Sequence, residues 1–112
     1  MAVAERLVLG VDASAAMFVN SLRAIKDQQI KKTIVATLRT LLFADLDALP
    51  AKLHLHQLSG REVVSATQSG KKVKVWTLHV TPDDRYKASF TLEDNIAYLR
   101  LVDEHDVIDK RP

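Results

Sequence analysis

The chain has 112 residues, 16 Lys and Arg against 14 Asp and Glu, a net charge of +2 and no cysteine. This length fits a single domain, residues 1–112. The absence of cysteine excludes a disulfide scaffold and a Cys-based zinc site, and it is compatible with a cytoplasmic protein. A net charge this small does not argue for nucleic acid, so the distribution of the basic residues must carry that argument.

The N-terminal residues predict an edge strand followed by a helix. Arg6 to Val11 (RLVLGV) is short, apolar and partly β-branched. Asp12 or Ser14 can cap the helix that follows, in which apolar residues recur at spacings of three and four as far as Ile25. Charged residues interrupt the apolar run and no segment is long enough to cross a bilayer, so we expect neither a signal peptide nor a membrane span.

A second amphipathic helix is predicted after Asp27, another possible cap, and it should end near Ala44. Its apolar positions are Ile30, Ile34, Leu38, Leu41 and Leu42. Because the connection between the two helices is short, they should be antiparallel neighbours. Pro50 ends the helical region, and residues 51–61 then alternate apolar and polar side chains, as in a strand.

The C-terminal half predicts an antiparallel meander. Residues 75–80 (VWTLHV), 85–92 (RYKASFTL) and 96–102 (IAYLRLV) alternate apolar and polar side chains and are separated by polar turns. One face should be apolar and pack a core: Trp76, Leu78, Val80, Tyr86, Ala88, Phe90, Leu92, Ala97, Leu99 and Leu101. The opposite face should be polar and solvated: Thr77, His79, Arg85, Lys87, Ser89, Thr91, Tyr98 and Arg100. Residues 103–112 follow as a tail. The predicted fold is therefore α+β, with an N-terminal edge strand, an α-helical hairpin and a sheet of 3–4 antiparallel strands.

His79 and Lys87 lie on neighbouring predicted strands and point to the same face. Such neighbours are about 4.5–5.5 Å apart at Cβ, or about 7–8 Å on the diagonal, so one phosphate can contact both. The imidazole can act as base or acid, and the ammonium can stabilise negative charge. Arg100, on the next predicted strand, should point to the same face as His79 and Lys87. The alternative is a solvated sheet face without a site.

The other three histidines are considered separately. His105 follows the last strand and stands beside Asp106, a carboxylate that can orient the imidazole. His54 and His56 would share one face of an extended segment. Two ligands without a third are poor evidence for a metal site, so a surface strand is the preferred interpretation and no metal is expected.

Basic and aromatic residues suggest contacts with RNA. The candidates for the phosphate backbone and for stacking on a base are Arg61, Lys72, Lys74, Arg85 and Tyr98. A run of lysines is more often only a solvated charged face.

The order of these segments and their residue patterns resemble the RelE/ParE superfamily of small bacterial toxins. The matching segments are residues 18–42 (FVNSLRAIKDQQIKKTIVATLRTLL), residues 50–61 (PAKLHLHQLSGR) and the strands of residues 75–109. Tyr86-Lys87 stands where the family commonly has Tyr-Arg, and Glu104-His105 stands where it commonly has Gly-His. Lys keeps the charge but lacks the bidentate fork of Arg.

The resemblance implies a ribosome-dependent mRNA endonuclease that is neutralised by a cognate antitoxin and needs no metal or cofactor. Such enzymes activate a ribose 2′-OH to attack the adjacent phosphate, which requires a base, cations and an acid. His79, Lys87, His105 and Arg100 are the expected catalytic residues, with His54 and Asp106 as minor candidates.

Two alternatives use the same scaffold. A ParE-type protein binds and inhibits DNA gyrase without RNA chemistry, and Lys87 in place of Arg together with the early C-terminus favours it. A non-toxic domain would keep the fold only to bind a partner, and the chain would then suit a piece of a longer protein. Convergence of His79, Lys87 and His105 within reach of one phosphate would favour the nuclease, whereas their divergence would favour the gyrase binder.

Overall fold

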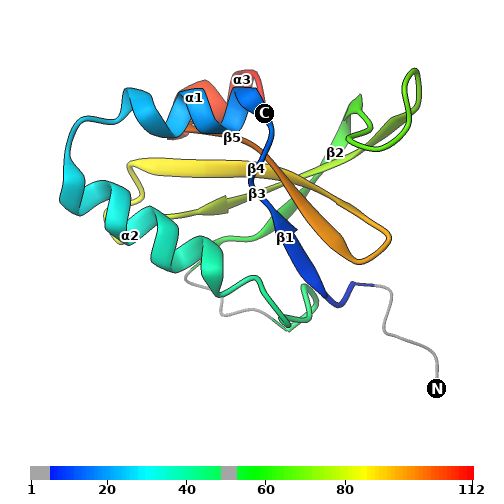
Figure 1. Ribbon diagram of the computed structural model, residues 1–112, viewed down its shortest axis with the longest axis horizontal. Helices are drawn as coiled ribbons and strands as arrows, with labels where there is room; N and C mark the ends of the chain where they lie inside the picture. The colour runs from blue at the N-terminus through cyan, green and yellow to red at the C-terminus, as the bar shows by residue number, and fades with distance from the viewer. Residues whose placement is uncertain (1–5, 49–52) are drawn as a thin grey trace.

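A five-stranded sheet carries two helices on one face and a short third helix on the other (Figure 1). The computed structural model describes residues 6–48 and 53–112. In chain order the elements are β1 (Gly10–Asp12), α1 (Ala16–Ala24), α2 (Gln28–Arg39), β2 (His56–Val64), β3 (Lys72–His79), β4 (Tyr86–Glu93), β5 (Ile96–Glu104) and α3 (His105–Lys110). The strand order is β1-β5-β4-β3-β2, and only the β1–β5 pair is parallel. The predicted α+β class is confirmed, with the short N-terminal strand at the edge. Pro50 and the first residues of the alternating segment lie outside the described residues.

The two predicted helix caps have different outcomes. The Asp27 carboxylate caps α2 by accepting hydrogen bonds from the amides of Gln29 and Ile30. The prediction that Asp12 or Ser14 caps α1 is wrong, because α1 begins after Ala15 without a side-chain cap. Asp12 instead accepts hydrogen bonds from the amide and the hydroxyl of Ser14, at 2.8 and 2.6 Å, and so fixes the turn between β1 and α1.

Helix α2 ends at Arg39, about a turn earlier than the sequence predicts. After the helix the chain makes backbone hydrogen bonds with the N-terminal segment. Phe43 donates its amide hydrogen to the Val8 carbonyl at 2.7 Å, and Val8 donates to the Ala44 carbonyl at 2.8 Å. The strand predicted over Arg6 to Val11 is therefore split between this contact and the shorter β1.

The core lies between the sheet and the pair α1 and α2. Phe18 of α1 and Ile34 and Leu38 of α2 pack with the predicted apolar face of β3 and β4. The predicted parity fails in the second half of β5. Phe90 pairs with Leu99 but Ser89 pairs with Leu101, so one residue, Arg100, is inserted as a bulge.

The bulge reverses which side chains of β5 enter the core. Val102 is 1% exposed and lies in the core, whereas Leu101, predicted there, faces the opposite side. The same bulge removes Arg100 from the polar row in which the sequence placed it.

Residues 105–110, predicted as part of a tail, form α3, which packs on β4 and β5. The Ile108 side chain is fully buried, and it lies outside the core cluster that α1 and α2 build. The predicted solvated face is therefore wrong, since Thr77, Ser89 and Thr91 on that face are 0–1% exposed. A six-residue helix does not persist alone, so docking onto the sheet holds it.

The Glu93 carboxylate fastens the loop between β2 and β3 to the end of β4. It accepts hydrogen bonds from the hydroxyls of Ser65, Thr67 and Thr91 and from the amide of Ala66. Burial alone would raise the pKa of this carboxyl, but these hydrogen bonds outweigh burial and leave the pKa below its ordinary value.

We expect Glu93→Gln to lower the free energy of unfolding by about 1–2 kcal/mol at pH 7, because the amide cannot accept all four hydrogen bonds. A depressed pKa stabilises the fold above the pKa of the unfolded state, and that stabilisation is lost as pH falls through the folded-state pKa. The difference between wild type and variant should thus shrink between pH 7 and pH 3, measured by urea unfolding. Glu62→Gln, at an exposed position of β2, is the control. An equal difference at both pH values would contradict the assignment.

No helix within residues 6–48 and 53–112 is long and apolar enough to cross a membrane.

Candidate functional site

Three histidines and a lysine gather where β3 ends. His79 is the last residue of β3 and is paired in register with Lys87 of β4. The His54 ring stacks on the His79 ring with centroids 4.4 Å apart, and the His105 ring meets it edge-on at 5.3 Å. We call His54, His79, Lys87 and His105 the histidine cluster. Four elements, the loop before β2, strands β3 and β4, and α3, each contribute one of these side chains.

The turn between β3 and β4 orients His79. Thr81 donates its hydroxyl hydrogen to Asp83 at 2.7 Å, and this carboxylate accepts the Arg85 amide hydrogen at 3.1 Å, which tightens the turn. Asp84 follows in the left-handed region, with φ of 60°. Its carboxylate lies 2.7 Å from His79 Nδ1, and this hydrogen bond holds the pKa of the Asp84 carboxyl below its usual value. The carboxylate therefore fixes the orientation of the ring.

Helix α3 supplies a second carboxylate, Asp109, that joins two members of the cluster. One Asp109 oxygen lies 2.7 Å from Lys87 Nζ and the other lies 3.0 Å from His105 Nδ1. Burial alone would raise the pKa of the Asp109 carboxyl, but the Lys87 hydrogen bond and the nearby positive charges outweigh it and lower the pKa. Asp106, expected to orient His105, lies farther away at 3.6 Å, and its side chain is 93% exposed. Asp109 is therefore the closer partner of His105.

The sequence analysis did not identify Asp84 or Asp109. Asp84 lies five residues after His79 across a tight turn, and a hairpin of that length can bring its carboxylate back to the ring. Asp109 lies four residues after His105, a spacing that puts two side chains on one face of a helix. The spacing was visible, but residues 103–112 had been interpreted as a tail.

The histidine cluster is buried at its base and open at its rim. His79 is 8% and Lys87 7% exposed, so the two are shielded from bulk water. His54 and Asp84 are exposed and His105 is partly exposed. A ligand therefore reaches the cluster from the side of these three residues, and it meets an ammonium already paired with Asp109.

Arg100 is not part of the cluster. Lys87 is in register with Asp103, so Arg100 lies three residues away along β5, or about 10 Å at roughly 3.3 Å per residue. Its guanidinium lines hollows with Met17 and Tyr98, and its Nε, buried, has no hydrogen-bond partner among the described residues. Desolvation lowers the pKa of this group. The bulge separates Arg100 from the histidines it was predicted to join.

The five candidate RNA-binding residues are scattered. Arg85 is the nearest to the cluster: its carbonyl accepts the His105 amide hydrogen at 2.8 Å, and its side chain is exposed above the Tyr86 ring. Lys72 and Lys74 are exposed but differ in strand parity from His79, so they face the other side of the sheet.

The remaining two lie apart from the histidine cluster. Arg61 is exposed and donates to the Lys110 carbonyl at 2.9 Å. Tyr98 is half-buried beside Arg100, on the face of β5 that was predicted to be polar.

Two groups of side chains among the described residues could hold a metal ion. His54, His79 and Asp84 form one group, and His105, Asp106 and Asp109 form the other, each with its potential ligand atoms within 4.8 Å of one another. The prediction that His54 and His56 share one face of an extended segment is wrong, since His54 has a left-handed backbone and stacks on His79, while His56 starts β2 and is exposed.

The histidine cluster combines two imidazoles oriented by carboxylates with an ammonium. Imidazoles move protons near neutral pH, and an ammonium in a partly dry site stabilises negative charge. The arrangement can therefore transfer protons beside an anionic group.

No family model and no curated protein matches the sequence. Among solved structures, the chain is similar to a copper-bound mutant toxin from Helicobacter pylori, with a TM-score of 0.49 and 16% identity over 91% of this chain and 98% of that chain. It is also similar to a metal-bound toxin from Helicobacter pylori, with a TM-score of 0.48 and the same identity and coverage. At this level the similarity concerns the path of the chain and assigns no activity to the protein.

Proposed function

We propose that the protein is a RelE-type toxin that cleaves mRNA in the ribosome, with the histidine cluster as its active site. The observation that carries the proposal is the convergence of His79, Lys87 and His105. These residues were selected from the sequence as catalytic candidates, and they come from three different elements. A solvated sheet face has no reason to gather them or to orient two of them with carboxylates.

The proposed reaction is a transesterification that breaks one phosphodiester bond of the RNA. His79 donates its Nδ1 hydrogen to Asp84, which leaves Nε2 free to accept the proton of the ribose 2′-OH. The 2′ oxygen attacks phosphorus, the bond to the 5′ oxygen breaks, and His105 donates a proton to that leaving oxygen. The products are a 2′,3′-cyclic phosphate and a 5′-OH. Lys87 stabilises the negative charge that grows on the phosphate oxygens.

Asp109 holds the two groups that act on the phosphate and the leaving oxygen. Its carboxylate lies 2.7 Å from the Lys87 ammonium and 3.0 Å from His105 Nδ1, so it orients both groups. The substrate phosphate would share the ammonium with Asp109, since an ammonium offers three donors. Arg85, exposed beside the cluster, is the candidate for binding the next phosphate of the RNA.

Induction in a bacterium followed by mapping of mRNA 5′ ends tests the proposal. We expect new 5′ ends inside translated regions and arrest of translation with the wild type, but not with His105→Ala, a change at a partly exposed position. His56→Ala, an exposed histidine outside the cluster, should behave as wild type. Unchanged transcripts with normal translation would overturn the endonuclease proposal. Intact transcripts with inhibited gyrase supercoiling would establish the gyrase alternative, and normal growth would indicate a non-toxic domain.

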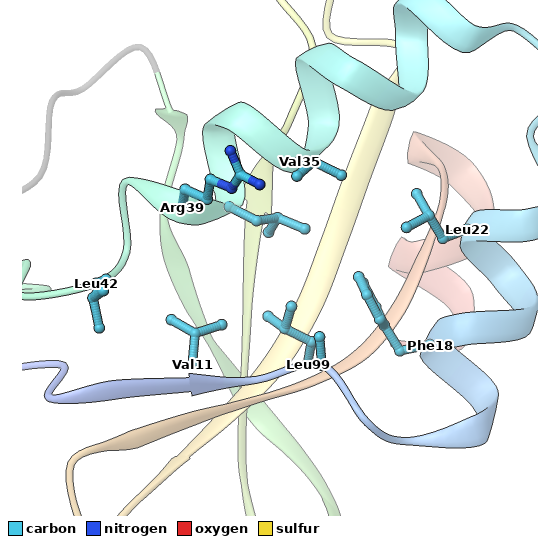
Figure 2. A pocket seen from close by; sticks show the side chains of 9 residues that line it. Val11, Phe18, Leu22, Val35, Arg39, Leu42 and Leu99 are labelled. Atoms are coloured by element: carbon cyan, nitrogen blue, oxygen red, sulfur yellow. The ribbon is translucent and has the colours of Figure 1, made fainter.

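The cognate antitoxin is the proposed partner, and a groove on the helical side supports its docking there. The groove has a volume of about 530 Å³ and lies between α1, α2 and the edge of the sheet (Figure 2). Its lining is apolar except for one residue: Val11, Ala13, Phe18, Leu22, Val35, Leu38, Arg39, Leu42 and Leu99. Arg39 is exposed and has no ion-pair partner within the described parts of the chain. An amphipathic antitoxin helix with an acidic residue facing Arg39 fits this lining.

We expect Leu42→Asp to weaken antitoxin binding at least about tenfold, because it places an unpaired carboxylate in an apolar groove. Leu42 is 44% exposed in the free protein, so the fold should tolerate the change. Met17→Asp is the matched control, since Met17 is equally exposed but lies outside the groove. Titration calorimetry with the small DNA-binding protein expected from a neighbouring gene measures both. Equal affinity of Leu42→Asp and wild type would exclude the groove as the docking site.

A further inference from the structure

A carboxylate and two imidazoles meet at the rim of the histidine cluster. His54 comes from the loop before β2, His79 from the end of β3 and Asp84 from the turn between β3 and β4. One potential ligand atom of each lies within 4.8 Å of the other two. We propose that His54, His79 and Asp84 bind one divalent transition-metal ion, with Zn²⁺ as the reference case.

The donor set selects the kind of metal. Two imidazole nitrogens and one carboxylate oxygen suit Zn²⁺, Ni²⁺, Co²⁺ or Cu²⁺, whereas Mg²⁺ and Ca²⁺ prefer oxygen ligands alone. Three protein ligands leave the fourth position of a tetrahedral ion open for water or another ligand. The site is therefore one that exchanges its outer ligand, unlike a closed structural site.

The distances require only a small rearrangement. Zn–N bonds are about 2.0–2.1 Å, so two ligand nitrogens on one tetrahedral ion lie about 3.3–3.4 Å apart. The three ligand atoms are within 4.8 Å of one another and thus need to approach by at most about 1.5 Å. The two imidazoles are stacked with 16° between their planes, but a metal binds in the plane of each ring. His54, exposed and in a loop, is the ring that must turn out of the stack.

The neighbouring charges do not oppose a cation. Lys87, paired in register with His79, is the nearest ammonium, and Asp109 already neutralises it at 2.7 Å. The Asp84 side chain is 59% exposed and brings a full negative charge to the rim. His79 is held by the Asp84 hydrogen bond in one orientation, which reduces the ordering that metal binding requires.

Metal binding would also regulate the cluster. A metal ion on His79 occupies the nitrogen lone pair and leaves no base for the 2′-OH, so Zn²⁺ should inhibit mRNA cleavage and a chelator should restore it. This consequence depends on the proposed function, but the metal site itself does not.

Titration calorimetry with ZnCl₂ tests the site on the full chain without a histidine tag. We expect one ion per chain and at least about tenfold weaker binding for His54→Ala and for Asp84→Asn, with Mg²⁺ unable to compete. Both positions are exposed, so the fold should persist, and circular dichroism checks it. His56→Ala, two residues from His54 and outside the group, is the matched control and should bind as wild type.

Co²⁺ titration provides a second readout, because four-coordinate Co²⁺ absorbs strongly in the visible range and six-coordinate Co²⁺ absorbs weakly. We expect the strong band for wild type and His56→Ala, and its loss for His54→Ala. No binding of Zn²⁺, or equal binding by wild type and His54→Ala, would overturn the site. Zn²⁺ binding with no mRNA cleavage under any condition would leave the site intact and refute only the proposed function.

Discussion

Lys87→Met should lower the rate of mRNA cleavage by about 10²–10³-fold, because it removes the ammonium that stabilises charge on the scissile phosphate. Lys87 is 7% exposed and lies in register with His79, so no water molecule or mobile side chain can readily replace it. Methionine keeps the long apolar stem that packs on the sheet. The readout is the single-turnover rate on ribosomes programmed with a defined mRNA, which separates the chemical step from product release.

Two further variants separate chemistry from folding. Lys87→Arg keeps the charge and should retain activity within about tenfold of wild type. Arg85→Met removes an exposed cation beside the cluster and should raise KM more than it lowers kcat. Lys87→Met also leaves Asp109 without its ammonium, but that carboxylate is 42% exposed and water can solvate it. The loss of stability should therefore stay near 1 kcal/mol. Cleavage by Lys87→Met at the wild-type rate would exclude Lys87 from the chemistry.

Ile108→Ala should lower the free energy of unfolding by about 2–4 kcal/mol, since it opens a cavity under a fully buried side chain. Ile108 is the buried anchor of the six-residue α3, which also holds the sheet through the Lys87–Asp109 ion pair. Hydrogen exchange should show the amides of residues 105–110 losing protection before those of β3 and β4. Cleavage should fall as well, because His105 and Asp109 leave the histidine cluster with the helix.

Val107→Ala is the control for this prediction, because its side chain is only half-buried and on the same helix. It should change the free energy of unfolding by less than half as much. If Ile108→Ala matched Val107→Ala in both stability and exchange, α3 would not be docked as described.

Alternation in residues 75–80 and 85–92 was sufficient to predict the central hairpin and the shared face of His79 and Lys87. A period of two fixes which face each side chain takes, and a short polar turn fixes the register. The apolar stripes of the helices likewise predicted that α1 and α2 cover one face. The Asp27 cap was predictable because a carboxylate immediately before a helix can accept hydrogen bonds from the free amides of its first turn.

The features that could not be predicted depend on contacts between distant segments. The bulge at Arg100 leaves no trace in the sequence, because alternation continues on both sides of the extra residue. Helix α3 is too short for a periodic signal, and its existence depends on the space that Ile108 fills. The stack of His54 on His79 occurs with a left-handed backbone at His54, with φ of 47°, which a non-glycine residue rarely adopts.

The candidate site was likewise predicted only in part. His79, Lys87 and His105 were recognised by residue type and position, but their carboxylate partners were not, because both partners depend on the folded turn and on α3. Arg100 was assigned to the site by parity alone, and the bulge removed it.

Analysis of the RNA ends left on programmed ribosomes tests the central claim most directly. The purified protein should cut the mRNA and leave a 2′,3′-cyclic phosphate and a 5′-OH, and His79→Ala and Lys87→Met should cut it at least about 10²-fold more slowly. Intact mRNA with the wild type, or cleavage by both variants at the wild-type rate, would contradict an active site built from the histidine cluster.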